Sequence, residues 1–161
     1  MIFVTIGTQL PFDRLIEAVD QAIARTGISG FAQIGPGSYI PSNVRHERFV
    51  DADRFEELVS HASCIVSHAG MGSIISAMRY AKPAILMPRM AALGEHRNDH
   101  QLATARRFRD HALIRIANDA DEIIAAYREI QGMRIAPGAA VSAGATPELV
   151  SAIRSMVFGV D

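Results

Sequence analysis

Short apolar runs along this chain alternate with longer segments in which apolar residues recur every three or four positions. Residues 2–6, 31–34, 64–67, 84–87 and 113–116 are such runs, and residues 44–50 hold a further extended piece. A strand that is buried on both faces is apolar throughout, whereas a helix that covers a sheet is apolar on one side only. Alternating strands and helices therefore predict an α/β fold, a Rossmann-like, doubly wound parallel sheet with helices on both faces.

Turn and capping residues mark the expected ends of the helices. Pro11 and Asp13 open the first helix, and Gly27 stops it. Asp51 or Asp53 caps the second helix, and Lys82-Pro83 ends the third. A fourth helix covers residues 99–109 with Asp99 as its N-cap, and Asn118 or Asp119 caps a fifth.

The pattern predicts a single domain over residues 1–130, with no internal repeat. Residues 131–145 are rich in Gly, Ala and Pro, which is typical of a loose connector. Thr146 and Pro147 then start a last helix over residues 146–161. The apolar stripe of this helix packs either on its own domain or on a partner.

The composition is that of an ordinary globular protein, with 161 residues, 49% hydrophobic and 20% charged. A net charge of −1 gives no global indication of nucleic acid. The single cysteine, Cys64, forms no internal disulfide and fits a reducing compartment. The start of the chain lacks a basic leader, and no apolar run is long enough to span a bilayer. We therefore expect a cytoplasmic protein that a partner holds at the inner face of the plasma membrane.

Two loops at the predicted carboxyl edge of the sheet have the composition of a phosphate site. One is Gly7-Thr8-Gln9, and the other runs from His68 through Gly70, Met71 and Gly72 to Ser73. Glycines allow backbone N–H groups to approach an oxyanion, the serine offers a hydroxyl, and the following helix offers its positive dipole end. These features predict a nucleotide-diphosphate site, although the same glycines would also suit a tight turn. The P-loop and the complete G-x-G-x-x-G fingerprint are both absent from the sequence.

A second polar cluster covers residues 94–101, in the loop after the apolar run at residues 84–87 and at the start of the next helix. Its dense hydrogen-bonding groups suit the hydroxyls of a sugar. His96 and His100 have a spacing that would allow zinc if both were helical, but no third ligand accompanies them. We therefore expect no metal.

Three segments, FVTIGTQLPFDRLI, VSHAGMGSIISAMRYAKPAILMPR and EHRNDHQLATA, occur in this order. Together they resemble the C-terminal, sugar-nucleotide-binding half of the GT-B glycosyltransferases of family 28. The chain looks closer still to free-standing catalytic subunits of two-part enzymes. These include the dolichol-pathway N-acetylglucosaminyltransferase and the glucuronosyltransferases of bacterial exopolysaccharide assembly.

The resemblance assigns parts of a UDP-sugar to particular residues. It implies that the diphosphate lies against Gly7, Thr8 and the turn at residues 70–73, and that the uracil lies near Phe49 and Val50. The remaining expected substrate-binding residues are His68, Arg89, His96, Asn98, His100 and Gln101. One departure concerns the ribose, because Ser76 stands where the wider family has a glutamate.

A GT-B enzyme has two such domains, so the resemblance implies a membrane-anchored partner that binds a lipid-linked acceptor. The implied reaction is inverting transfer from a UDP-sugar without a metal or other cofactor. The catalytic base is unknown, with His68 and Glu95 as candidates in this chain.

The donor is expected to be UDP-glucuronate or UDP-N-acetylglucosamine. Arg89, His96 and Arg97 would pair with the carboxylate of a uronic acid. The alternative functions are a non-catalytic nucleotide-sugar sensor or scaffold subunit and a homodimer of two such domains.

Overall fold

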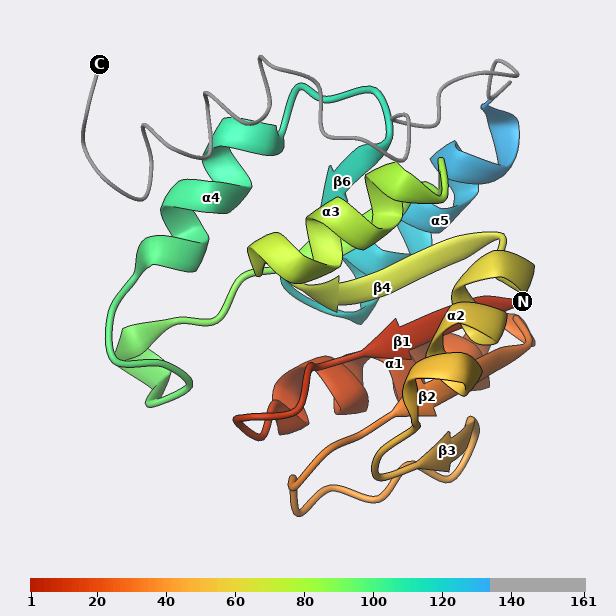
Figure 1. The fold of residues 1–161 in the computed structure, drawn as a ribbon, viewed down its shortest axis with the longest axis horizontal. Coiled ribbons are helices and arrows are strands. Elements are labelled where there is room, and N and C mark those ends of the chain that lie inside the picture. The colour runs from red at the N-terminus through yellow and green to blue at the C-terminus, as the bar shows by residue number, and fades with distance from the viewer. Residues whose placement is uncertain (134–161) are drawn as a thin grey trace.

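Six parallel strands form the centre of the structure, a computed structural model that describes residues 1–133 (Figure 1). The strands are β1 (Ile2–Thr5), β2 (Gly30–Gln33), β3 (Arg45–Glu47), β4 (Cys64–His68), β5 (Ala84–Met87) and β6 (Ile114–Ile116). Their order across the sheet is β3-β2-β1-β4-β5-β6, which confirms the predicted doubly wound α/β fold. From β1 the chain adds β2 and β3 on one side of the sheet and then β4, β5 and β6 on the other side, so the strand order reverses between β1 and β4.

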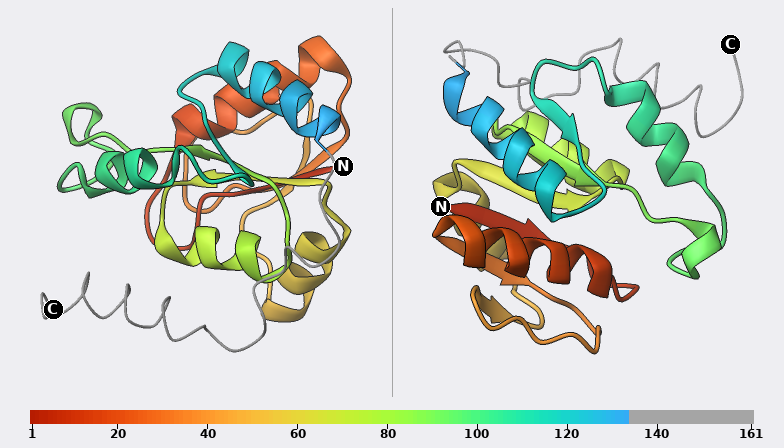
Figure 2. Two further views of the ribbon diagram at one scale, coloured as in Figure 1. Left: turned by 90° about the horizontal axis from the view of Figure 1, so that it is seen from above. Right: turned by 180° about the vertical axis from the view of Figure 1, so that it is seen from behind.

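Helices cover both faces of this sheet (Figure 2). Helices α1 (Asp13–Thr26) and α5 (Ala120–Gly132) lie on one face, and α2 (Ala52–His61) and α3 (Met71–Arg79) lie on the other. Helix α4 (His100–Phe108) lies beyond the end of the layers, after the short 3-10 turn η1 (Ala91–Leu93). Alternate strand residues enter the two cores: Val4 lies in the core with α1 and α5, and Phe3 lies in the core with α2 and α3, where its ring packs edge-on against Phe55 of α2. Among residues 1–133, no helix has the length and apolar character needed to cross a membrane.

The predicted helix signals hold at several boundaries. Gly27 ends α1 in the left-handed conformation (φ 69°), and the carboxylates of Asp51 and Asp119 accept backbone N–H groups at the starts of α2 and α5. Asp99 differs, because its carboxylate accepts the N–H of Ala91 (2.8 Å) and leaves α4 without a side-chain cap. Helix α5 extends through Gly132, so the first two residues of the expected connector are helical. The rest of that connector and the expected last helix lie outside the described residues.

A buried carboxylate fixes the long connection between β2 and β3 to α1. Asp20 is only 3% exposed and accepts hydrogen bonds from the hydroxyl of Tyr39 and the backbone N–H groups of Ser42 and Asn43. Burial raises the pKa of Asp20, but these hydrogen bonds outweigh burial and lower the pKa below its ordinary value. The folded state therefore stabilises the charged carboxylate.

Replacing this carboxylate should lower stability in a pH-dependent manner. We expect Asp20→Asn to reduce the free energy of unfolding by about 1–3 kcal/mol at pH 7, because buried donors lose a charged acceptor. Since the folded-state pKa of Asp20 is depressed, its contribution is present above the unfolded pKa of about 3.9 and is lost as pH falls through the lower folded value. Urea denaturation at pH 7 and pH 3 measures both effects. The exposed Asp121→Asn is the control, and equal stabilities of the two variants at pH 7 would contradict the prediction.

Candidate functional site

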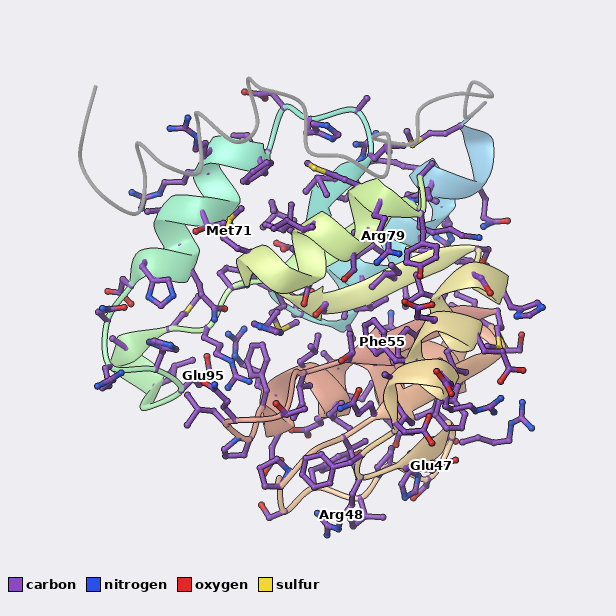
Figure 3. The ribbon with its side chains drawn as sticks, viewed as in Figure 1. Glu47, Arg48, Phe55, Met71, Arg79 and Glu95 are labelled. Atoms are coloured by element: carbon purple, nitrogen blue, oxygen red, sulfur yellow. The ribbon has the colours of Figure 1, made fainter. Side chains whose placement is uncertain are left out.

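A cavity of about 240 Å³ opens where β1, β4 and β5 end, at the point where the strand order changes direction. Ligands of doubly wound sheets bind in this crevice. Figure 3 labels Met71 at the start of α3 and Glu95 in the loop after β5, both at this end of the molecule. The cavity is lined by Ile6, Gly7, Thr8, Gln9, Leu10, His68, Arg89, His96 and Gln101.

The imidazole of His68 lies between the two predicted glycine loops. A Cβ atom added at Gly7 would lie 3.2 Å from Cε1 of His68, and one added at Gly70 would lie 2.3 Å from Nε2. Gly7 also has a φ of +77°, which favours glycine. The glycines at positions 7 and 70 thus make room for His68, whereas we expected them to make room for an anion. Of glycines 7, 70 and 72, only Gly72 leaves open space around an added Cβ.

This placement keeps His68 neutral near pH 7. Burial, followed by the positive charge of Arg89, lowers the pKa of His68 to about 4. A neutral imidazole contacts a ligand as a hydrogen-bond partner and adds no positive charge to the site.

The first turn of α3 begins three residues after His68, which lines the cavity, although residues 70–73 do not line it themselves. The backbone N–H groups of Met71, Gly72 and Ser73 have no hydrogen-bond acceptor among the described residues. Three such groups at a helix N-terminus form a favourable anion site.

The hydroxyl of Ser73 contacts the sheet. The hydroxyl oxygens of Ser73 and Ser67 lie 2.8 Å apart, and Ser67 Oγ lies 2.6 Å from the carbonyl oxygen of Thr5, which accepts its proton. The Ser73 hydroxyl is therefore paired with Ser67 in this structure, and its expected contact with a phosphate stays a prediction.

Arg89 differs from its expected role as a partner for a sugar carboxylate. It is 2% exposed, and its two terminal nitrogens donate to the carbonyl oxygens of Ile6, Leu10, Pro11 and Glu95. The guanidinium also lies 4.5 Å from the centre of the Phe12 ring. Four of its five N–H groups are therefore occupied by backbone, which leaves only the Nε–H.

Glu95 is poorly placed to act as the catalytic base that we considered. Its carboxylate forms a two-pronged ion pair with Arg14, with distances of 2.7 Å from Nε to Oε1 and 2.8 Å from Nη2 to Oε2. It also accepts the backbone N–H of Met90. These donors stabilise the carboxylate and occupy its lone pairs, so Glu95 is an anchor of the loop after β5.

His96 and Gln101 line the cavity with free polar groups. Nδ1 of His96 is buried without a hydrogen-bond partner among the described residues. The amide oxygen of Gln101 accepts the N–H of Arg89 (3.1 Å), which leaves the Nε2 donors of Gln101 available. Burial and the positive charges nearby, His100 first among them, lower the pKa of His96.

The other predicted residues lie around the cavity without lining it. His100 is exposed, packs edge-to-face on His96 with ring centres 4.4 Å apart, and bonds to the side chain of Asn98. Phe49, half exposed, and Val50 follow β3 at the same carboxyl edge. Within residues 1–133, no group of three or more His, Cys, Asp or Glu side chains comes together. The expectation of no metal stays a prediction.

A comparison with family models matches residues 1–139 to the glycosyltransferase family 28 C-terminal domain. The chain belongs to this family. Among curated relatives of this family-28 domain, the human UDP-N-acetylglucosamine transferase subunit ALG13 is 32% identical over 116 residues, and the mouse protein is 30% identical over 105 residues. These alignments cover 65% and 58% of the chain but only 10% and 9% of the relatives.

Solved structures confirm the fold. The family-28 domain superposes on an ALG13 solution structure with a TM-score of 0.63 and 21% identity, covering 97% of this chain and 94% of the other. It superposes on Acinetobacter baumannii MurG with a TM-score of 0.59 and 18% identity, covering 80% and 40%. The rice enzyme Os79, solved with UDP, gives a TM-score of 0.63 at 15% identity, covering 81% and 31%.

A side chain at position 70 should destabilise the domain, whereas one at position 72 should not. We expect Gly70→Ala to cost about 1–3 kcal/mol of unfolding free energy, because the new Cβ overlaps the His68 ring. Gly72→Ala, in open space, should stay within about 0.5 kcal/mol of the parent or gain stability from its helix preference. Urea denaturation of both variants checks this pair, and a Gly70→Ala variant as stable as Gly72→Ala would refute the packing role of His68.

The depressed pKa of His68 should appear in titrations and in the pH dependence of stability. Between pH 6.5 and about 4, His68 is protonated in the unfolded chain and neutral in the folded one. The free energy of unfolding should therefore fall as the pH falls through this range. NMR detection of the imidazole nitrogens should show His68 neutral at pH 6, and His68→Gln should flatten the stability slope over this range. A folded-state midpoint near 6.5 would be the contrary result.

Proposed function

We propose that this family-28 domain binds a UDP-sugar and supplies the donor half of an inverting glycosyltransferase. The observation that carries the proposal is the open first turn of α3, with its three unpaired N–H groups, beside a cavity that presents His96 and Gln101. The turn suits a diphosphate, and the cavity suits the hydroxyls of one hexose. Phe49, at the same edge, offers an aromatic face for the uracil.

In the proposed reaction, a hydroxyl oxygen of the acceptor attacks the anomeric carbon of the donor. The bond from that carbon to the β-phosphate oxygen breaks, and UDP departs with the electron pair. The N–H groups of α3 stabilise the charge that develops on the departing diphosphate. The proton of the hydroxyl passes to a base, which we assign to a second subunit because His68 and Glu95 are both engaged within this chain.

A separate partner chain completes the cleft in this proposal. The curated relatives are named as transferase subunits, which supports a two-part enzyme. We further propose that the partner is membrane-anchored and holds a lipid-linked saccharide acceptor for polysaccharide synthesis. The domain would then be cytoplasmic and peripheral at the inner face of the plasma membrane.

Among donors, UDP-N-acetylglucosamine is favoured over UDP-glucuronate. Arg89 was one of three expected partners for a uronate, with His96 and Arg97, and four backbone carbonyls occupy its terminal nitrogens. The human relative is named a UDP-N-acetylglucosamine transferase subunit, which supports the same choice.

A nucleotide-sugar sensor or scaffold subunit is the second candidate function. Two observations favour it: Ser76 replaces the expected ribose-binding glutamate, and both candidate bases have structural roles. Such a protein would bind the donor without transferring its sugar.

Binding and transfer measurements test the proposal and separate the two functions. We expect calorimetry to show binding of UDP and UDP-N-acetylglucosamine, and Gly72→Ala to weaken both at least about tenfold, because its methyl group shields the N–H groups from a phosphate. Gly132→Ala, also in open space but on α5, is the matched control.

Transfer of radiolabelled sugar to a lipid acceptor, with the co-expressed partner, completes the test. Binding with transfer supports the enzyme, and binding without transfer supports the sensor. Failure of the wild-type chain to bind any uridine diphosphate compound, with the partner present, would reject both.

A further inference from the structure

Two arginines and one glutamate join the three loops that surround the donor cavity. Arg89 follows β5 and donates to carbonyl oxygens of the loop after β1. Arg14, in the first turn of α1, forms the ion pair with Glu95 and also donates to the carbonyl oxygens of Pro88 and Asn118. We call these three side chains the Arg14–Glu95–Arg89 clamp.

The aromatic ring of Phe12 joins the two cations of the clamp. The guanidinium carbons of Arg14 and Arg89 lie 5.3 Å and 4.5 Å from the centre of this ring, which is itself 1% exposed. Arginine is favoured over an aromatic face in such contacts. The carboxylate of Glu95 balances one of the two charges, so the clamp retains a net positive charge beside the cavity.

The clamp side chains hold the segment that carries His96, and the backbone of Arg89 holds Gln101. His96 follows Glu95 directly, and Glu95 is held by its carboxylate and its carbonyl oxygen. Gln101 is oriented by the backbone N–H of Arg89, which accounts for the direction of its free amide. None of the clamp's hydrogen bonds involves the first turn of α3, where the proposed diphosphate site lies.

From this separation we infer that the clamp sets discrimination between a UDP-sugar and free UDP. The inference rests on the proposed function and deepens it: α3 binds the diphosphate, and the clamp positions the residues that bind the sugar. The members of the clamp are positioning residues. They act on the sugar through His96 and Gln101, so their loss reduces affinity for the donor more than affinity for the product.

The test compares the Kd of UDP with those of UDP-N-acetylglucosamine and UDP-glucuronate, by calorimetry on the full chain with its partner. The variants are Arg14→Met and Glu95→Gln, with Arg14→Lys as a milder change that keeps the charge but loses the planar fork. Arg115→Met is the matched control. Arg115 lies on β6 and does not line the cavity, and its Nε pairs with Oε2 of Glu129 on α5 at 2.8 Å. We expect the clamp variants to weaken the preferred UDP-sugar about tenfold and UDP less than about threefold. Arg14→Lys should lie between wild type and Arg14→Met.

A second readout follows the positioned side chain itself. In the NMR spectrum, Glu95→Gln should shift the side-chain amide signals of Gln101, and Arg115→Met should leave them unchanged. An equal loss of affinity for UDP and for the UDP-sugars would overturn the inference, as would unchanged affinities in folded clamp variants. A wild-type chain that binds no uridine diphosphate compound would instead reject the proposed function, and the inference with it.

Discussion

The parallel pairing of β1 with β4 determines most of what this domain can bind. The register sets Thr5 opposite Ser67, so the two strands end together and their loops leave the sheet side by side. His68, one residue further along β4, then lies between Gly7 and Gly70. Any side chain at position 70 would displace this ring, and its displacement would move the loop that begins α3. A single strand register thus links the first loop of the chain to a helix that begins 64 residues after Gly7.

The site is electrically positive without an exposed charge at its centre. His68 is neutral near pH 7, the N–H groups of α3 carry only partial charges, and Arg89 is buried. A buried guanidinium that is bonded to carbonyl oxygens keeps its charge, because carbonyl dipoles solvate it much as water does. Such preorganised dipoles would hold the diphosphate of the proposed donor without the rearrangement that flexible surface side chains would need.

The sequence predicts the framework of this domain well, because the framework depends on local signals. Apolar runs, capping aspartates and glycine stops identified all six strands and five α-helices that the structure describes over residues 1–133. The carboxyl-edge location of the two loops followed from the parallel fold alone. The long-range contacts of individual side chains could not be predicted in this way. Arg89 contacts carbonyls that lie 78 to 83 residues away in the sequence, and Arg14 reaches Glu95 across 81 residues. No periodicity or short motif encodes such contacts, so an arginine beside a sugar site could not be distinguished from a structural one.

Ser73 illustrates the same limit at short range. A serine at a helix start beside two glycines is typical of a phosphate contact, and the residue type alone supports that interpretation. Its hydroxyl instead contacts Ser67, which belongs to a buried polar row with Thr5 and Gln33 across three adjacent strands. A hydroxyl next to such a row forms its hydrogen bond within the protein. Under the proposed function, the backbone N–H groups of α3 would then be the donors to the diphosphate, and side chains would contact the sugar, which is where relatives with different donors would differ.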